Sequence, residues 1–250
     1  MDNVIEIKSC WTCDMGPKMK ADFMFVVNSV FGQYCSEEYF GLKYSENPYG
    51  ESVIVVAYEN GAPVGADALW RNDVMGCKSY QSADTAVIES SRGKGIFTKM
   101  VKEKLSKIND DSLIYGFPNR NSFHGFEKMG WTVGRLYKSL FFCKSFLKES
   151  DEIIDNVYAN WWLKPQKGLS YIRKGKYYFL IRKKKGKPIC HVIGRVDREV
   201  ALMYPKTQGP FILTYFSNKP SLLKMNDVGM PYILYTRCDV EIPYWKIDSI

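Results

Sequence analysis

The segment that most constrains the fold is ESSRGKGIFTKM, residues 89–100. It follows a strand-like run, YQSADTAVI, and precedes a run with helical spacing, VKEKLSKI. A glycine turn between a strand and a helix leaves backbone N–H groups without acceptors at the start of the helix. Together with the positive end of the helix dipole, these donors suit a phosphate or pyrophosphate group. The sequence therefore predicts an anion-binding turn at this point of the chain.

The glycines and basic residues of this turn carry that prediction. Gly93 and Gly95 have no Cβ, which would let the backbone approach a phosphate closely, and Arg92 and Lys94 add positive charge. The turn does not match the P-loop pattern GxxxxGK[ST]. It does not match the dinucleotide pattern GxGxxG either, because the third glycine position falls at or near Lys99. Taken alone, RGKG is also compatible with an exposed turn that carries basic residues.

Hydrophobic spacing organises residues 1–143 into strands and helices. Strands are expected at 4–8, 53–58, 64–70, 80–88, 112–117 and 131–142, and helices at 18–31, 96–108 and 122–128. Asn60-Gly61, between two of these strands, is a strong hairpin signal. This order predicts an α/β or α+β domain in which helices pack on a sheet.

The second half of the chain is rich in predicted strands and follows a predicted helical linker at 144–165. In the C-terminal domain, 166–250, strands are expected at 177–182, 190–196, 211–216 and 232–238. The turn GKPI at 186–189 stands 125 residues after the turn GAPV at 61–64. Together with a shared strand order, this repeat favours a degenerate second copy of the first domain.

The composition is that of a folded, basic protein with free thiols. Of the 250 residues 46% are hydrophobic, and the net charge of +8 points to anionic partners without choosing among phosphate ligands, nucleic acid and membranes. The seven cysteines are an odd number and mostly isolated, which predicts a reducing compartment. Cys10 and Cys13 form a CxxC pair, but no second pair completes a zinc site, so we predict no metal. Without a signal peptide or an apolar span of roughly 20 residues, the sequence predicts a soluble cytoplasmic protein with no membrane partner.

Two motifs in the first half resemble the GNAT superfamily of acetyl-CoA-dependent N-acetyltransferases. The family signature R/Q-x-x-G-x-G/A, after the fourth strand, is similar to RGKGIF at 92–97. The second signature, an asparagine, a small residue three positions on and then Y-x-K-x-G-F, is similar to Asn119, Ser122 and FEKMGW at 126–131. The resemblance covers about residues 4–142. With the NPYG stretch, it extends to GNAT proteins of bacterial surface-polysaccharide loci, and a tandem member with a degenerate second half fits the repeat.

The resemblance implies a fold, a cosubstrate and a set of binding residues. The fold is a central mixed, mostly antiparallel sheet with helices on both faces, joined to a smaller strand-rich C-terminal half. The cosubstrate is acetyl-CoA, whose pyrophosphate would lie on the turn while its pantetheine arm pairs with strand backbone. The residues implied to bind it are Val87, Ile88, Arg92, Gly93, Lys94, Gly95, Ile96, Phe97 and Asn119. The implied reaction is acetyl transfer to the primary amine of a small acceptor, for which an amino sugar of a surface-polysaccharide precursor is our first hypothesis.

The sequence departs from the family pattern at two phenylalanines. Phe97 stands where glycine or alanine is usual, and Phe126 stands where many members carry a tyrosine that protonates the departing thiolate. His124 is the candidate to replace this acid, because an imidazole exchanges protons near neutral pH; an exposed histidine is the alternative. Asp84 and Glu89 flank the strand that would bind the cosubstrate, and Asp84 is the candidate base, because the two-residue period of a strand places it on the face of Ala86. For Glu89, balancing the charge of Arg92 or Lys94 is the alternative, and for both a solvated or ion-paired carboxylate is.

Residues 164–187 form a basic segment with ten Lys or Arg and no acidic residue. Its interleaved aromatic residues are compatible with RNA binding through phosphate contacts and stacking. Attraction of a phosphorylated acceptor and a solvated hairpin tip are the other two interpretations. The hairpin tip is favoured for Lys183 to Lys187, whereas the choice stays open for Arg173 to Lys176, and nucleic acid is the less expected partner. RNA binding would fit an alternative function, a tandem-GNAT transferase that takes its acyl group from aminoacyl-tRNA. A second alternative, favoured by the missing tyrosine, is a non-catalytic CoA-binding protein.

Overall fold

The chain forms two compact units in the computed structural model, Met1–Val133 with Tyr232–Val240 and Gly134–Pro231 with Glu241–Ile250. The structure describes residues 4–109, 111–141, 147, 153–164, 166–184, 186–208, 212–217, 230–235 and 242. Residues 142–146 and 148–152, around the start of the predicted linker, lie outside the described residues. The domain limits expected from the sequence, 1–143, 144–165 and 166–250, stay a prediction.

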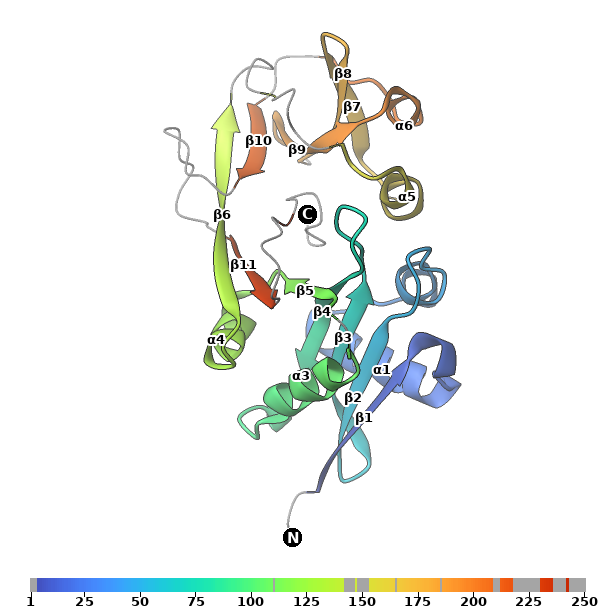
Figure 1. Ribbon diagram of the computed structural model, residues 1–250, viewed down its shortest axis with the longest axis vertical. Coiled ribbons are helices and arrows are strands. Elements are labelled where there is room, and N and C mark those ends of the chain that lie inside the picture. Colours follow the sequence, from blue (N-terminus) through green and yellow to red (C-terminus); the bar gives the residue numbers. More distant parts are fainter. Residues whose placement is uncertain are drawn as a thin grey trace. The chain divides into compact units, whose positions relative to one another are not determined.

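The first unit is built on a mixed sheet whose strands run mostly antiparallel (Figure 1). In spatial order the strands are β1 (Ile5–Trp11), β2 (Val53–Glu59), β3 (Ala62–Arg71), β4 (Ser79–Val87), β5 (Leu113–Gly116) and β11 (Met230–Tyr235). Each neighbouring pair is antiparallel except β4 and β5, which are parallel. Parallel neighbours need a crossover connection, and α3 (Ile96–Ser106) supplies it. The mixed, mostly antiparallel sheet predicted for this part of the chain is confirmed.

Helices cover both faces of this sheet. α3 lies in front of it and α1 (Pro17–Phe31) behind it in Figure 1. β2 is buried through Tyr58, as expected of a strand with helices on both sides. Val55 packs with Met100 of α3 in one core cluster, which also contains Phe126 of α4 (Arg120–Lys128). The other helical segments of this unit are α2 (Glu37–Phe40), a π turn at Gly41–Ser45, and 3-10 turns at Thr12–Asp14 and Glu89–Ser91.

β4 contains a bulge and separates early from its parallel neighbour. The register of the β3–β4 pair shifts at Asp67, which faces two residues of β4, Asp84 and Thr85. Asp84 has a positive φ of 51°, which few non-glycine residues adopt. Pairing of β4 with β5 ends at Ser82, although β4 continues to Val87. Beyond Ser82, one edge of β4 therefore has no strand partner within the described part of the first unit.

The second unit has a sheet of its own. In spatial order its strands are β6 (Thr132–Phe141), β10 (Ile212–Ser217), β9 (Ile189–Val196), β8 (Tyr177–Lys183) and β7 (Leu169–Lys174). β9 and β10 are parallel, and the other neighbouring pairs are antiparallel. The helix α6 (Arg198–Leu202) connects β9 to β10, and α5 (Asn156–Tyr158) with a π turn at Ala159–Leu163 precedes β7. A cluster that includes Ile172, Phe179 and Val192 forms the core.

The 125-residue repeat predicted from the sequence is wrong in its register. It would match the antiparallel pair β3–β4 with the parallel pair β9–β10. The strand order agrees one strand earlier instead: β2, β3 and β4, like β7, β8 and β9, are antiparallel neighbours followed by a helix and a parallel strand. The offset fails because glycine and proline are ordinary turn residues, so one shared turn does not decide which strands correspond. Its expected counterpart of the glycine turn, 217–220, lies outside the described residues beyond Ser217.

The strands and helices predicted for the first unit are all present. Three short elements are not predicted: α2 in the first unit, and α6 and β7 in the second. α2 and α6 span four and five residues, which is too short for a helical period to show in a sequence. β7, LSYIRK, lies within the basic segment, whose charges interrupt the hydrophobic pattern. In the described part of the predicted helical linker, 153–164, α5 and the π turn follow each other directly and together span residues 156–163.

Gly125 of α4 makes room for the large side chain at the start of α3. A Cβ at Gly125 would lie 2.5 Å from Cε1 of Phe97. The Phe97 ring also meets the Phe126 ring edge-on, with centroids 5.0 Å apart. The departure from the family pattern at Phe97 is thus accommodated by a missing side chain on the facing helix.

We expect Gly125→Ala to destabilise the protein by about 1–3 kcal/mol, because the new methyl group overlaps a ring in a packed contact. In a Phe97→Ala background the same substitution should be neutral or stabilising by up to about 1 kcal/mol, because alanine favours a helix more than glycine does. Urea unfolding of the four proteins measures both effects. Equal effects of Gly125→Ala in the two backgrounds would contradict the contact.

Candidate functional site

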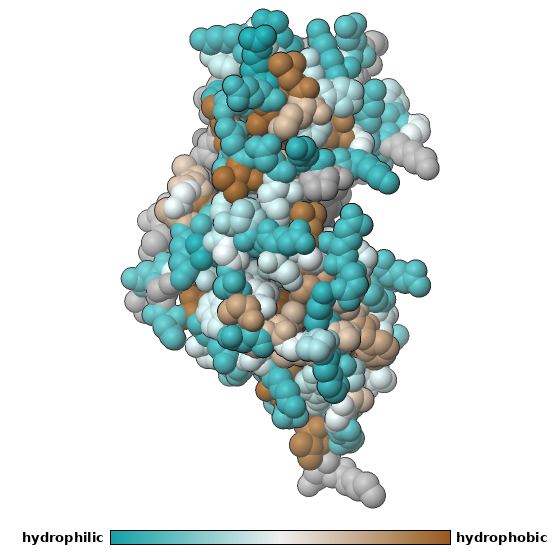
Figure 2. Space-filling model, turned by 90° about the vertical axis from the view of Figure 1, so that its right-hand side faces the viewer, coloured by the Kyte–Doolittle hydropathy of each residue, from teal (hydrophilic) through white to brown (hydrophobic). Residues whose placement is uncertain are grey.

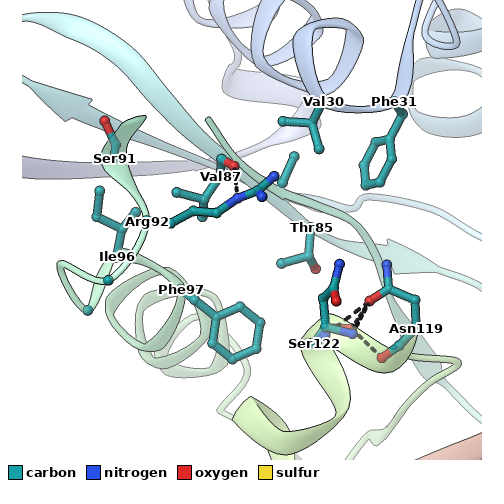
Figure 3. Close-up of a pocket in the computed structure, with 14 residues that line it drawn as sticks. Val30, Phe31, Thr85, Val87, Ser91, Arg92, Ile96, Phe97, Asn119 and Ser122 are labelled. Atoms are coloured by element: carbon teal, nitrogen blue, oxygen red, sulfur yellow. Dashed lines mark hydrogen bonds between the residues drawn. The ribbon is translucent and has the colours of Figure 1, made fainter. Parts of the chain in front are cut away.

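A pocket of about 600 Å³ lies in the first unit (Figure 3). Its walls are the end of α1, the open edge of β4, the glycine turn and the start of α4. Val30 and Phe31 come from α1, residues 85–87 come from β4, and Asn119 precedes α4. A pocket of this volume is typical of a small-molecule site.

The glycine turn, part of which lines this pocket, has free backbone N–H groups. The N–H of Arg92 donates to the Glu89 carbonyl oxygen, and that of Lys99 donates to the Gly95 carbonyl oxygen. Between them, the N–H groups of residues 93–98 have no acceptor in the described part of the chain. Gly95 is the N-cap of α3, and no side chain caps the helix there. The positive end of the α3 dipole therefore adjoins the pocket with its donors available.

Backbone conformation, rather than crowding within the protein, requires the two glycines. Gly93 has a φ of 78° and Gly95 a φ of 74°. This left-handed region costs a residue with a side chain about 1–2 kcal/mol. A Cβ at either position would meet no atom within 4 Å. Close approach of a phosphate, the reason for glycine given by the sequence argument, stays a prediction.

The two basic residues of the turn have different contacts. Arg92 extends along the pocket, and its Nε donates to the Val87 carbonyl oxygen at 3.1 Å (Figure 3). Lys94 is not part of the lining; its Nζ lies 2.5 Å from Glu59 Oε1. Ser91 donates to the other oxygen of Glu59, and these bonds from Lys94 and Ser91 hold the pKa of Glu59 below its usual value. Among the described lining residues, the positive charge therefore comes from Arg92.

Val87 and Ile88 are the two residues predicted to bind a ligand through their backbone, and of these only Val87 faces the pocket. The Ile88 N–H donates to the Val64 carbonyl oxygen of β3, so it points away from the open edge. Backbone groups of successive strand residues point to opposite edges, and those of Val87 therefore face the pocket, where its carbonyl oxygen meets Arg92. Val87 is part of the lining and Ile88 is not.

Asn119 caps α4 and lines the pocket on the side away from Arg92 (Figure 3). Its Oδ1 accepts hydrogen bonds from the N–H groups of Asn121 and Ser122, each at 3.0 Å. This is the usual geometry of an asparagine N-cap. Figure 3 shows its side-chain nitrogen pointing away from these bonds. The cap thus leaves the nitrogen as a donor beside the pocket.

Neither predicted catalytic side chain belongs to the pocket lining. The Asp84 side chain is 6% exposed; its carboxylate accepts a hydrogen bond from Tyr44 and lies 3.4 Å from Lys43 Nζ. His124 is exposed on α4, with its Nδ1 3.3 Å from Glu127 Oε2. The roles of Asp84 as base and of His124 as acid stay predictions.

Phe126, at the position of the family tyrosine, belongs to the core. It is 3% exposed and packs against Trp131, with ring centroids 4.6 Å apart. It is not part of the pocket lining. The Phe126 side chain has no acidic proton, so it cannot act as a general acid.

A buried charged pair beside the pocket is not singled out by the sequence argument. Asp67 of β3 and Lys104 of α3 are fully buried, with Lys104 Nζ 2.6 Å from Asp67 Oδ1. Thr85, which lines the pocket, donates to the same oxygen at 2.7 Å. Burial raises the pKa of Asp67 and lowers that of Lys104, because it disfavours both charged forms. Two features of the sequence could have revealed this pair. Asp67 interrupts the apolar strand APVGADALW, and Lys104 is in helical register with the apolar residues Ile96 and Met100.

The charges of the basic segment are not gathered on one surface. Most of those described lie at the two ends of β8: Arg173, Lys174 and Lys176 at one turn, and Lys183, Lys184 and Lys187 at the other. The seven residues of β8 span about 20 Å at roughly 3.3 Å per residue. The face in Figure 2 is covered mostly by hydrophilic side chains, with hydrophobic ones in small groups. RNA binding by residues 164–187 stays an untested alternative.

Three further sequence-based expectations concern a membrane span, a metal site and the cysteines. No helix in the described ranges is long and apolar enough to cross a membrane. Within the same ranges, no three His, Cys, Asp or Glu side chains stand close enough together to hold a metal ion. The described cysteines are all free thiols, namely Cys10, Cys13, Cys35, Cys77 and Cys190.

Comparison with known proteins identifies the fold. No protein-family model and no curated protein sequence matches the chain. Solved structures match: a GCN5-related N-acetyltransferase from Anabaena variabilis (TM-score 0.60) and one from Kribbella flavida (TM-score 0.57), each 11% identical over 92% of this chain and 72% of theirs. A probable N-acyltransferase from Enterococcus faecalis is 12% identical, with a TM-score of 0.58, over 93% of this chain and 73% of its own.

At these identities the likeness establishes the fold alone. The chain has the mixed α/β fold of the GNAT N-acetyltransferases, and the fold class predicted from the sequence is confirmed. In this chain, residues 92–97 form the turn before α3 and the first two residues of that helix, and Asn119 is the N-cap of α4.

We expect Asp84→Asn to destabilise the protein by about 3 kcal/mol, because it removes a counter-charge of the fully buried Lys43 ammonium. The double variant Asp84→Asn with Lys43→Met should recover most of this loss, because neither buried charge remains. Urea unfolding measures the three proteins. An unchanged unfolding midpoint for Asp84→Asn would show that the carboxylate is not committed to this pair, and would leave it free to act as a base.

Proposed function

We propose that the first unit binds acetyl-CoA and transfers the acetyl group to the primary amine of a small acceptor. The observation that carries this proposal is the turn before α3, whose free N–H groups and Arg92 stand beside a pocket with an open strand edge. Phosphate suits the start of a helix, and amide groups suit a free strand edge. Acetyl-CoA carries a pyrophosphate and an arm with amide groups, so it fits both features.

Each predicted binding residue is assigned a part of acetyl-CoA according to which of its polar groups are free to bind it. The N–H groups of residues 93–97, with Arg92, would hold the pyrophosphate. The backbone of Val87 would pair with the arm, and Arg92 would then release the Val87 carbonyl oxygen that it now contacts. The side-chain nitrogen of Asn119 would donate to the arm from the other side. The backbone N–H of Ile88 and the side chain of Lys94 are the weaker members of the proposed set, because they already bond to Val64 and Glu59.

Acetyl transfer needs an unprotonated amine, stabilisation of the charge that develops on the carbonyl oxygen, and a proton for the departing thiolate. The bound cosubstrate supplies the activated thioester. The described lining contains no carboxylate, imidazole or phenol. The proposed acid, His124, would therefore have to exchange protons with the reactants through water. The proposed base, Asp84, would in addition have to leave its ion pair with Lys43.

The acceptor is proposed to be an amino sugar, possessing a primary amine on a ring. Phe31, 44% exposed at the end of α1, lines the pocket together with Val30. A sugar ring presents apolar C–H groups that pack on an aromatic face. This wall supports a ring-shaped acceptor on the α1 side of the pocket.

We expect acetyl-CoA to bind the wild-type protein and to lose at least 100-fold in affinity with Gly95→Glu. The substitution strains a left-handed residue and places a carboxylate where the pyrophosphate would lie. Gly130→Glu is the matched control. Gly130 also has a positive φ, 80°, a Cβ added there would meet no atom within 4 Å, and the residue follows the C-terminal end of α4. Isothermal titration calorimetry measures the three proteins.

A wild type that does not bind acetyl-CoA would contradict the proposed function. Equal losses in Gly95→Glu and Gly130→Glu would also count against it, because the effect would then reflect the fold rather than the turn. For a protein that binds, release of free thiol from acetyl-CoA in the presence of glucosamine tests the transfer itself.

A further inference from the structure

A polar cluster is buried where β3, β4 and α3 meet. Lys104 Nζ donates to Asp67 Oδ1 at 2.6 Å and to Ser82 Oγ at 2.7 Å. Neither charged side chain has exposed surface. Replacing such a pair by apolar residues of similar size is often neutral or stabilising. Stability alone therefore does not account for a charged pair at this place.

The cluster fixes the direction of one hydroxyl group. Thr85 Oγ1 donates to Asp67 Oδ1 at 2.7 Å, and the same oxygen also accepts from the Ala68 N–H at 3.0 Å and from Lys104. A threonine hydroxyl has one proton and two acceptor sites. Because its proton is given to Asp67, Thr85 can only accept a hydrogen bond from anything that enters the pocket.

Thr85 lies where its hydroxyl oxygen could accept a hydrogen bond from a ligand. It lines the pocket next to the bulge and lies between Arg92 and Asn119 in Figure 3. Those two neighbours present a guanidinium and an amide nitrogen, which are donors. A ligand N–H group at this point would find its acceptor in Thr85.

We propose that the Asp67–Lys104 pair holds the Thr85 hydroxyl as a hydrogen-bond acceptor for an N–H group of the bound ligand. This rests on the proposed function, which supplies two such groups: an amide of the pantetheine arm, or the amine of the acceptor. Thr85 touches the ligand, and Asp67 and Lys104 are positioning residues that act through it.

Thr85→Val and Thr85→Ser separate the hydroxyl from the shape of the side chain. If the donor is the pantetheine amide, acetyl-CoA affinity falls about tenfold in Thr85→Val, the loss of one hydrogen bond, and stays within about threefold of wild type in Thr85→Ser. If the donor is the amine, acetyl-CoA affinity is unchanged, and KM for glucosamine rises about tenfold in Thr85→Val at constant kcat. Thr214→Val, a buried strand threonine of the second unit, is the matched control.

The double variant Asp67→Leu with Lys104→Met tests the positioning role, because it releases the hydroxyl without leaving a buried charge. We expect it to lose as much affinity, for acetyl-CoA or for the amine, as Thr85→Val does. Adding Thr85→Val to it should give no further loss, an outcome that general loosening of the structure would not produce. Independent, multiplying losses would overturn the positioning role.

The outcomes distinguish this inference from the function on which it rests. A wild type that binds acetyl-CoA while Thr85→Val matches it in both affinity and KM overturns the inference alone. A wild type that binds no acetyl-CoA overturns the proposed function, and the inference falls with it.

A separate observation concerns the second unit. The Ile154 N–H donates to the Arg195 carbonyl oxygen of β9 at 2.7 Å, and Ile153 forms a parallel bridge with Arg195. β8 occupies one edge of β9 as far as Val196. Residues 153–154 therefore pair at the other edge, from which β10 separates after His191. Ile154 is fully buried there.

This edge of β9 corresponds to the edge of β4 that lines the pocket. Pairing with the parallel neighbour ends at Ser82 in β4 and at His191 in β9. A bulge follows two residues later, at Asp84 and at Ile193. Where the glycine turn follows β4, Asp197 follows β9 as the N-cap of α6, and its negative charge disfavours a phosphate.

We infer that the second unit repeats the first with its ligand edge filled by residues 153–154 of the chain itself, so that one chain binds one acetyl-CoA. The ligand named here rests on the proposed function, whereas the strand contacts do not. Calorimetry should give one binding equivalent for the wild type, and that binding should weaken at least 100-fold in Gly95→Glu. Two equivalents, or one class of sites that keeps wild-type affinity in Gly95→Glu, would overturn the inference. A wild type without binding would refute the proposed function but agree with an occupied second edge.

Discussion

The pocket of the first unit depends on the bulge in β4 and on the charged pair that faces it. A bulge bends a strand and ends regular pairing, and β4 separates from β5 just before Asp84. Asp67, opposite the bulge, bonds to Thr85 of β4 and to Lys104 of α3. The same contacts thus fix the open strand edge and the helix whose N-terminus adjoins it.

The polar groups around this opening favour one kind of ligand. Free N–H groups and Arg92 stand at the glycine turn, and the backbone of Val87 faces the open edge. Thr85 donates its proton to Asp67, so we infer that its oxygen serves as an acceptor between them. An anionic group at one end and amides along an arm match this order. In the second unit, the chain's own residues 153–154 pair with the edge of β9 at the corresponding place, and Asp197 replaces the glycine turn.

The sequence predicts the backbone of the site better than its side chains. The glycine turn, the β2–β3 hairpin and the asparagine before α4 carry local signals, because turn and cap positions restrict residue type. Asp84 was expected on the face of Ala86 from the two-residue strand period, but the extra residue of the bulge breaks that period. Lys94 turns to Glu59, which is distant in the sequence, so no local pattern could reveal this contact. The register of the proposed repeat failed for a related reason, because it rested on one turn without knowledge of strand direction.

Hydrogen exchange of the backbone amides of residues 93–98, with and without saturating acetyl-CoA, tests the central claim most directly. These N–H groups have no acceptor in the described part of the chain, and the account predicts that acetyl-CoA slows their exchange at least tenfold, together with that of Val87. Exchange in the turn at Gly186, another glycine with positive φ, should not change. Unchanged exchange at residues 93–98 would contradict the assignment of this turn as the site of the pyrophosphate.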